Sequence, residues 1–340
     1  MRIGLIGGGN ISATHAQAAS TISGVELVAI YGENQHKVDR LSREYGARAY
    51  PDLGAFLSFR PMDMVIIGSP SGLHAEQGIL VAQQGLHVLV EKPIAVSGQQ
   101  SAALVGACKK ANIKLGVIFQ DRFKPEIRRL RDLIREGTLG RILLADARMK
   151  WYRPPDYYSQ SRWRGTWRLD GGGALINQGS HTVDLLLWLL GDVARVQART
   201  ATLLHSIETE DTALALLEFT GGALATLVAT TAAYPGYSRR IEITGTEGTV
   251  ILENDLIVAA DLHALSATLS NEALTRNPSP SSPVISDTRG HQSAIEDFIR
   301  AVEHNALPEC DGKEAQRSLA LIEEIYRASA NTVVGAFSYR

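Results

Sequence analysis

Short apolar runs alternate with amphipathic segments from residue 3 to residue 120 of the chain. The runs are rich in β-branched residues and predict strands at 3–6, 25–31, 64–67, 87–90 and 114–119. Between them, segments such as Gln35–Tyr45 and 73–84 place apolar residues at helical spacing. This alternation is typical of a parallel sheet covered by helices on both faces. We therefore predict a doubly wound α/β domain over residues 1–122.

The pattern changes in the second half, which we assign to a second domain over residues 123–340. The expected elements are, in order, a helix at 125–136, an aromatic and basic segment at 151–167, a glycine run, a helix, a hairpin about Gly221 and Gly222, a hairpin about Gly245 and Gly248, a Pro/Ser-rich loop at 276–287, and helices at 291–303 and 312–330. The last helix is a candidate to pack back on the first domain.

The first hairpin, 212–232, carries small apolar or hydroxyl residues on both faces and little charge. A sheet with one hydrated face alternates more sharply between apolar and polar positions. We therefore expect both faces to be covered, one of them by helices of the same chain. The other has two candidate covers, a second subunit or longer loops of this chain, and the sequence leaves that choice open.

Composition narrows the class of protein. Net charge is -2, with 45% hydrophobic and 21% charged residues and no long run of one sign, so neither nucleic acid nor an anionic membrane is an expected partner. The two cysteines, Cys108 and Cys310, stand apart, which argues against a disulfide framework or a metal site. A strand-like run from residue 3 leaves no room for a signal peptide, and no apolar stretch reaches membrane-spanning length. The expected location is cytoplasmic.

The opening stretch "MRIGLIGGGNIS" places a glycine-rich turn between a predicted strand and a predicted helix. In a dinucleotide-binding turn Gly7 would make the tight bend and Gly9 would let the backbone approach the pyrophosphate. A helix that begins near Asn10 and Ile11 would point its free N–H groups at the phosphates. Ser12 takes the place of the third glycine and is small enough to keep helix and strand close.

The end of the second strand bears on cofactor choice. An acid that holds the ribose hydroxyls is expected there, but "VAIYGENQ" has Gly32 at that position and Glu33 directly after it. No arginine adjoins Glu33 to receive a 2′-phosphate, so we expect NAD, with NADP as the alternative. Glu33 could equally be a solvated loop residue.

Two further stretches place polar side chains against apolar runs. "VLVEKPIAV" sets Glu91 and Lys92 at the carboxyl end of a predicted parallel strand, the edge at which open α/β sheets bind ligands. In "GGGALINQGSHTVDLLLWLLG" the spacing puts Asn177, His181 and Asp184 on one helical face if the segment is helical. The plainer alternatives are that the Glu91–Lys92 stretch is a surface turn and that His181 is a structural buried histidine. The glycine run before the segment and the three polar residues on one face favour catalysis.

Together these motifs identify a resemblance. "GGGNISATH", "GSPSGLHAEQ", "EKP", "FQDRF", "YYSQSRWRGTW", "GGGALINQGSHTVDLL", "GTEGTV" and "GHQSAIEDF" follow the order seen in the Gfo/Idh/MocA family of NAD(P)-dependent sugar and inositol oxidoreductases. The resemblance implies an N-terminal Rossmann domain and a C-terminal α/β domain with an open, mainly antiparallel mixed sheet. Family members commonly form tetramers through that sheet, so a homo-oligomer, either a dimer or a tetramer, is expected.

The resemblance also implies the site. Lys92 and His181 would flank the substrate hydroxyl, as stabilising cation and general base, with position 177 as third member. Many relatives have aspartate there, whereas Asn177 can only orient. Asn177→Asp is therefore expected to do less harm than the loss of Lys92 or His181. Implied cofactor contacts are Ser69, Pro70, His74, Glu91, Lys92, Gln120, Trp163 and Arg164; Arg122 and, with Lys150 as a weaker candidate, Arg153 would border the substrate.

The expected activity is hydride transfer between a nicotinamide cofactor and a secondary hydroxyl of a cyclic polyol, sugar or sugar acid, nucleotide-linked ones included. In the family the N-Q-G-x-H variant accompanies W-R-G-T-W in enzymes that act on sugar acids and nucleotide sugars. One alternative is a redox-neutral epimerase or glycosidase that retains its NAD. Another is a non-catalytic sugar sensor, which has no need of the acid–base pair Lys92 and His181.

Overall fold

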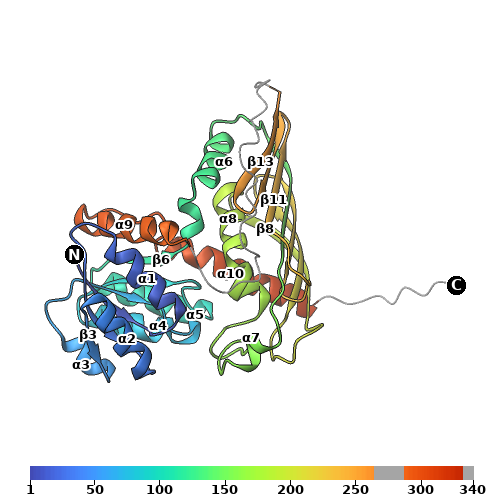
Figure 1. Ribbon diagram of the computed structural model, residues 1–340. Coiled ribbons are helices and arrows are strands. Elements are labelled where there is room, and N and C mark those ends of the chain that lie inside the picture. The colour runs from blue at the N-terminus through green and yellow to red at the C-terminus, as the bar shows by residue number, and fades with distance from the viewer. Residues whose placement is uncertain (264–286, 332–340) are drawn as a thin grey trace.

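The computed structural model describes residues 1–263 and 287–331, which fold around two sheets (Figure 1). The first is parallel, in the order β3-β2-β1-β4-β5-β6. Its strands are β1 (Arg2–Ile6), β2 (Glu26–Tyr31), β3 (Arg48–Tyr50), β4 (Met64–Ile67), β5 (His87–Glu91) and β6 (Leu115–Ile118). The strand order reverses between β1 and β4, so this is the Rossmann arrangement with its switch point at β1.

Helices cover both faces of this sheet, as the alternating pattern predicted. They are α1 (Asn10–Ser20), α2 (Gln35–Tyr45), α3 (Leu53–Ser58), α4 (His74–Gln83) and α5 (Gly98–Lys110). Val65 and Val88 face one hydrophobic cluster, whereas Leu5 and Ile66 face the other. Each strand therefore buries both faces, which explains its continuous apolar run.

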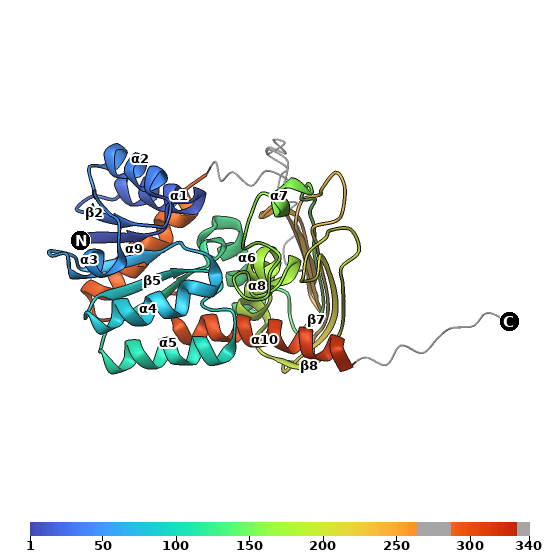
Figure 2. The same ribbon diagram turned by 90° about the horizontal axis from the view of Figure 1, so that it is seen from below.

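The helix α9 (Arg289–Glu303) departs from the domain division drawn from the sequence. It was assigned with residues 123–340 to the second domain, but it packs beside α1 (Figure 2). Ile295 and Phe298 are fully buried in the cluster that contains Leu5. A Cβ on Gly116 of β6 would lie 2.5 Å from the Phe298 ring, so that strand is shaped to receive α9. The chain thus returns to cover a face that the first domain's own helices leave open.

The second sheet is mixed and mainly antiparallel, as expected, in the order β13-β12-β11-β7-β10-β9-β8. Its strands are β7 (Ile142–Lys150), β8 (Val193–Ala201), β9 (Thr212–Phe219), β10 (Leu224–Thr230), β11 (Arg240–Gly245), β12 (Gly248–Glu253) and β13 (Leu256–Leu262). Only β7 and β10 pair in parallel. Both expected hairpins, β9–β10 and β11–β12, are present. The Pro/Ser-rich stretch 276–287 lies, apart from Asp287, outside the described residues.

One face of the second sheet is covered by helices of the same chain (Figure 1). The remaining helices are α6 (Pro125–Arg135), α7 (Asp156–Ser159), α8 (Ser180–Leu190) and α10 (Gly312–Asn331). On the opposite face Leu144, Leu214, Leu216 and Leu224 are each about half exposed. Within residues 1–263 and 287–331, longer loops of the chain therefore do not cover that face.

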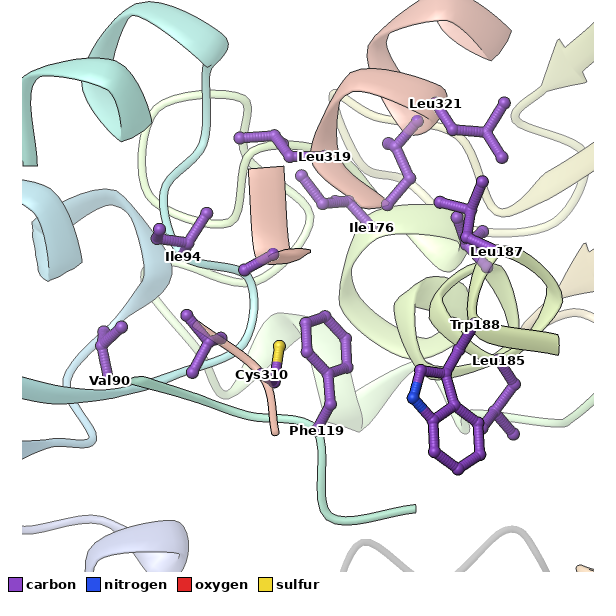
Figure 3. Close-up of a cluster of buried hydrophobic side chains, with 14 of the residues drawn as sticks. Val90, Ile94, Phe119, Ile176, Leu185, Leu187, Trp188, Cys310, Leu319 and Leu321 are labelled. Carbon is purple, nitrogen blue, oxygen red and sulfur yellow. The ribbon is translucent and has the colours of Figure 1, made fainter. Parts of the chain in front are cut away.

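A continuous core joins the two sheets. Val90 and Phe119, from β5 and the end of β6, lie in one cluster with Leu185 of α8 and Leu319 of α10 (Figure 3). The helix α10 runs from the side of α5 to β8 (Figure 2), and the N–H of Gly98 donates to Glu323 Oε1 at 2.8 Å. In the part of the chain described, no helix is long and apolar enough to cross a membrane.

Candidate active site

The glycine turn after β1 has the shape of a phosphate cradle. Gly7 has a φ of +130°, and a Cβ there would lie 2.4 Å from Ser12 Oγ and 2.6 Å from the carbonyl oxygen of Gly68. Gly9 has open space around its Cβ position and caps α1 without a side-chain hydrogen bond. The exposed first turn of α1, with Asn10 and Ile11, therefore presents backbone N–H groups to an incoming anion. This arrangement fits a dinucleotide pyrophosphate.

The sequence departs from the dinucleotide-binding pattern at two positions: Ser12 replaces the third glycine, and Gly32 replaces the ribose-binding acid. The structure gives a packing reason for each. Ser12 is fully buried, and its hydroxyl donates to the Gly68 carbonyl at 3.4 Å, so it bridges α1 and the end of β4. A Cβ on Gly32 would stand 3.1 Å from the backbone of both Gly7 and Gly8. The position after β2 has no room for the usual acid, and the exposed Glu33 follows it.

Lys92 reaches from β5 to the second domain. Its Nζ donates to the backbone carbonyl of Asn177 at 2.6 Å, so the main chain of Asn177, not its amide, receives the ammonium. The Lys92–Pro93 peptide bond is cis. The pKa of Lys92 is lowered, chiefly by burial. The charges of Glu91, Asp170 and Asp121 oppose this shift.

The segment that carries Asn177 is not the predicted α-helix. Residues Ala174–Gly179 form a π-helical turn, and α8 begins only at Ser180. The buried carboxylate of Glu210 holds the entry to this turn by accepting from the N–H of Gly173 at 2.9 Å and of Leu175 at 2.8 Å. The wider turn changes the angular spacing between Asn177 and the two α8 residues, His181 and Asp184, from that of a continuous α-helix.

His181 is largely buried, with 12% of its side chain exposed. Its ring packs edge-on against Phe119, and Nδ1 lies 4.0 Å from Asp121 Oδ2. Burial lowers the pKa of His181 to about 3; Asp121 opposes this shift, whereas Lys92 and Arg239 add to it. At neutral pH the imidazole is therefore uncharged.

Asp121 is a residue that the sequence reasoning missed, although "FQDRF" was noted. It is buried and lies 2.7 Å from both Lys124 Nζ and Arg239 Nη2. Burial would raise its pKa, but these cations and His181 hold the pKa well below the usual value. Its charge faces His181 from the end of β6.

Asp170, just before the glycine run, was also missed. Its side chain is 1% exposed. Oδ2 accepts from the N–H of Gly165 at 2.8 Å, and Oδ1 accepts from the Asn177 amide nitrogen at 2.5 Å. Burial raises the pKa of Asp170 to about 7, although these hydrogen bonds, Lys92 and Arg164 lower it. A single aspartate in a polar segment gives no periodic signal by which to find it.

Three residues expected to contact cofactor or substrate are instead buried and paired with other groups of the protein. Glu91 is buried, with Oε1 2.9 Å from His15 Nε2, so it does not face a cofactor. His74 is 1% exposed; its ring nitrogens lie 2.8 Å and 2.9 Å from the carbonyl oxygens of Pro93 and Ser69. It therefore ties together the loops after β4 and β5. Arg122 is 1% exposed and paired with Asp184 in the core, so it does not border the substrate.

The remaining expected residues lie on the second domain's side or at the sheet edge. Ser69 donates to Gln77 Oε1 at 2.6 Å, and Pro70 is partly exposed beside it. Gln120 is partly buried, and its Oε1 has no hydrogen-bond partner among the described residues. Trp163 is partly exposed, and Lys150 is exposed on β7.

Two arginines converge near the Lys92–Asn177 contact. The guanidinium carbons of Arg153 and Arg164 lie 5.3 Å and 4.2 Å from the ring centroid of Tyr157. Arg153 Nη2 also donates to Gln178 Oε1 at 3.0 Å, and Gln178 Nε2 donates to Asn177 Oδ1 at 3.1 Å. Arg153 thus joins the hydrogen bonds around Asn177, whereas Arg164 adjoins them by stacking on Tyr157, whose hydroxyl accepts from Gln178 Nε2 at 2.9 Å.

We also searched the described residues for side chains that could bind a metal ion. In residues 1–263 and 287–331, no group of three or more His, Cys, Asp or Glu side chains is arranged to hold a metal ion. Cys108 and Cys310 are both buried and free.

Comparison with known proteins gives matches over the whole chain. Residues 1–119 match the model of an oxidoreductase family with an NAD-binding Rossmann fold, and residues 127–251 match the GFO/IDH/MocA C-terminal domain. The structure resembles the WlbA dehydrogenase from Bordetella pertussis, solved with NADH and UDP-GlcNAcA, with a TM-score of 0.87, 34% identity and coverage of 98% of this chain and 96% of that one.

Two curated relatives come from Rhizobium meliloti. Inositol 2-dehydrogenase is 26% identical over 337 residues, which is 97% of each chain. The rhizopine catabolism protein MocA is 31% identical over 191 residues, 56% of this chain and 57% of that protein. With both family models matched in order and a related structure aligned from end to end, the chain belongs to the Gfo/Idh/MocA family of NAD(P)-dependent sugar and inositol oxidoreductases.

Proposed function

We propose that this enzyme transfers a hydride between NAD and a secondary hydroxyl of a nucleotide-linked sugar acid. The observation that carries the choice of an anionic substrate is the pair of guanidinium groups, Arg153 and Arg164, that share Tyr157 beside the Lys92–Asn177 contact. Guanidinium groups suit carboxylate and phosphate oxygens. The likeness to a dehydrogenase solved with UDP-GlcNAcA points to the same class of ligand.

The two groups that would handle the proton come from different domains. His181 would serve as the base that removes the hydroxyl proton, and the Asp121 carboxylate, 4.0 Å from its Nδ1, would stabilise the imidazolium that forms. The Lys92 ammonium, fixed by the Asn177 carbonyl, stabilises the charge that develops on the same oxygen. As the O–H bond breaks, its proton passes to His181 and its electrons form the C=O bond, while the C–H bond of the same carbon breaks and its hydrogen leaves as hydride.

The cofactor's place follows from the cradle. Gly7, Gly9, Asn10 and Ile11 would hold the pyrophosphate, with Glu33 at the ribose. When bound, NAD supplies the hydride acceptor. Lys92 ends the strand next to β4, whose own end closes on the glycine turn, so the lysine lies on the same edge of the sheet as the cofactor.

The test is NADH formation with a matched pair of substrates. UDP-N-acetylglucosaminuronic acid carries a carboxylate that UDP-N-acetylglucosamine lacks, and myo-inositol serves as the unlinked polyol. We expect the highest kcat/KM for the acid and a loss of about tenfold or more for the counterpart without the carboxylate, since a charge-assisted contact is lost. Equal kcat/KM for the two, or a preference for myo-inositol, would overturn the proposal.

The same assay separates the alternatives. A redox-neutral epimerase or glycosidase would convert its substrate without accumulation of free NADH. A sensor would bind sugar with no conversion, and its affinity would not depend on an intact Lys92 and His181.

A further inference from the structure

The carboxyl group of Asp170 is the one buried acid near Lys92 that has no cation of its own in the described residues. Three acids raise the pKa of Lys92: Glu91, Asp170 and Asp121. Glu91 is paired with His15, and Asp121 with Lys124 and Arg239. Among the described residues Asp170 forms no ion pair within 4.0 Å; it accepts only from a backbone N–H and the Asn177 amide.

A short chain of hydrogen bonds leads from Asp170 to Lys92. The Asp170 carboxyl accepts from the Asn177 side chain, and the Asn177 carbonyl accepts from Lys92 Nζ. The other end of the Asn177 amide accepts from Gln178 Nε2, so both ends of the amide are fixed in one orientation. Movement of Asp170 would therefore displace the residue whose main chain positions the lysine.

We propose that Asp170 is the positioning residue of this site: it fixes Asn177, and with it the carbonyl that receives Lys92, and it supplies the negative charge that an amide at position 177 cannot. This inference rests on the proposed oxidoreductase function. Asp170 itself is not expected to touch substrate, because its side chain is 1% exposed. The charged and titratable groups that face it are Lys92, Arg164 and Tyr158.

The arrangement corrects the expectation for Asn177→Asp. A carboxylate at position 177 would stand within hydrogen-bond distance of Asp170, and two such groups cannot both be charged without strong repulsion. We therefore expect Asn177→Asp alone to be harmful at and above neutral pH. The harm should be relieved when Asp170 becomes an amide, which restores one acid and one amide in the pair.

The experiment compares wild type, Asp170→Asn, Asn177→Asp and the double variant with both changes, all as full chains with NAD and any sugar that wild type turns over. We expect Asp170→Asn and Asn177→Asp each to lower kcat at least about tenfold with NADH affinity nearly unchanged, as for loss of a charged hydrogen-bond partner. The double variant should recover to within a few fold of wild type. The exposed Asp156, changed to Asn, is the matched control.

A pH profile separates positioning from a merely structural role. Wild-type kcat should change across pH 7, where Asp170 titrates, and Asp170→Asn should lose that limb. A double variant no better than either single one, or an Asp170→Asn enzyme with wild-type kcat and pH profile, overturns the proposal. Should Asp170→Asn fail to fold, a double variant more active than Asn177→Asp supports it, and equal activity overturns it.

A readout without turnover keeps this test apart from the substrate proposal. The pKa of Asp170 is raised in the folded state, so the acid favours folding at low pH, and that contribution is lost as pH rises from about 4 to about 7. The melting temperature of Asp170→Asn relative to wild type should rise over this window. A flat difference would show that the charge of Asp170 does not change over this window, and would overturn the assignment of the kcat limb near pH 7 to Asp170, whatever the substrate proves to be.

Discussion

Arg122 and Asp184, 62 residues apart, form a two-point ion pair with each side chain 1% exposed. Nε and Nη2 of Arg122 donate to the two carboxylate oxygens at 2.8 Å and 2.7 Å, and Ser318 Oγ donates to Asp184 at 3.0 Å. The pair thus joins the end of the first sheet to α8 and α10. An arginine expected to border the substrate instead holds the two domains together.

Asp184→Asn should destabilise the protein by about 3 kcal/mol, because it removes the two-point counter-charge of the buried Arg122 guanidinium and leaves only the longer contact to Glu314 at 3.3 Å. Urea unfolding at pH 7 measures this. The exposed pair Arg289–Asp287, which lies outside the second sheet, is the control: Arg289→Gln there should leave the free energy of unfolding nearly unchanged. Similar losses for the two variants would mean that the buried pair adds nothing to stability.

Much of the fold could be predicted because it depends on local patterns. Continuous apolar runs identified five of the six strands of the first sheet, and glycine pairs located both hairpins. The sixth strand, β3, has only three residues, Arg48–Tyr50, of which Tyr50 alone is buried. The position of α9 could not be predicted, because its amphipathic pattern specifies that one face is buried but not which sheet it covers.

The site was harder to predict than the fold. Motif position predicted Lys92, His181 and the glycine turn as site residues, but hydrogen-bond partners depend on three-dimensional packing. A polar residue at a strand end has the same sequence pattern whether it is partly exposed, as Gln120 is, or buried in the core, as Arg122 is. The π-helical turn at Ala174–Gly179 differs from an α-helix by one residue per turn and has no distinct sequence pattern.

Lys92→Ala and His181→Ala should each lower kcat by at least about 10²-fold, the usual contribution of a general base or an oxyanion-stabilising cation. NADH affinity, measured by fluorescence titration, should stay nearly unchanged, because the glycine cradle is intact. The matched controls are the exposed Lys109 and His304, each changed to Ala. Folded variants that keep wild-type turnover would show that these two residues are not the reacting pair.

NAD should give a higher kcat/KM than NADP, since the exposed Glu33 would repel a 2′-phosphate and no arginine adjoins it. Glu33→Arg should shift the NAD/NADP ratio of kcat/KM by about tenfold or more toward NADP, because it replaces repulsion by a guanidinium–phosphate contact. Glu44→Arg, an equal charge change at an exposed position on α2, should leave the ratio unchanged. A wild-type preference for NADP would refute this reading of Glu33.

Stability should fall in mild acid because His291 is buried. Burial lowers the pKa of His291 to about 4, with His15 adding to the shift and Glu91 opposing it. The unfolded chain therefore takes up a proton near pH 6.5 that the folded chain does not take until about pH 4, and the free energy of unfolding decreases across that window. The contribution is about 3 kcal/mol. Urea unfolding between pH 7 and pH 4 should show a shallower decrease for His291→Gln.

Glu91 acts in a separate pH window. Burial raises its pKa, but His15, His291 and Lys92 outweigh burial and lower it to about 2. Its contribution to stability is therefore lost only as pH falls from about 4.5 to about 2.

The control for His291→Gln is the exposed His304: changed to Gln, it should not alter the decrease in stability between pH 7 and pH 4. If His291→Gln has the same slope as wild type, the histidine is not buried in its neutral form.

The chain should form a dimer or a tetramer through the face of its second sheet that no described helix or loop of the chain covers. The strand register aligns Leu224 with Leu144 on β7 and Thr226 with Leu216 on β9, so Leu144, Leu214, Leu216 and Leu224 form one continuous apolar surface. Each is about half exposed, and contiguous apolar surface of this kind marks an interface. Light scattering at micromolar protein should therefore give a multiple of 36.8 kDa.

Leu216→Lys should break the assembly into monomers, because a contact between two copies would bring an ammonium group into an apolar interface on each side. The control is Leu307→Lys: Leu307 is 75% exposed but lies between α9 and α10, away from the sheet, so that variant should keep the wild-type mass. If Leu216→Lys is monomeric and still binds NADH, the sheet face is the interface and the cradle is complete within one chain. A wild-type mass of 36.8 kDa, or an unchanged mass in Leu216→Lys, would show that the leucines face solvent or a different partner.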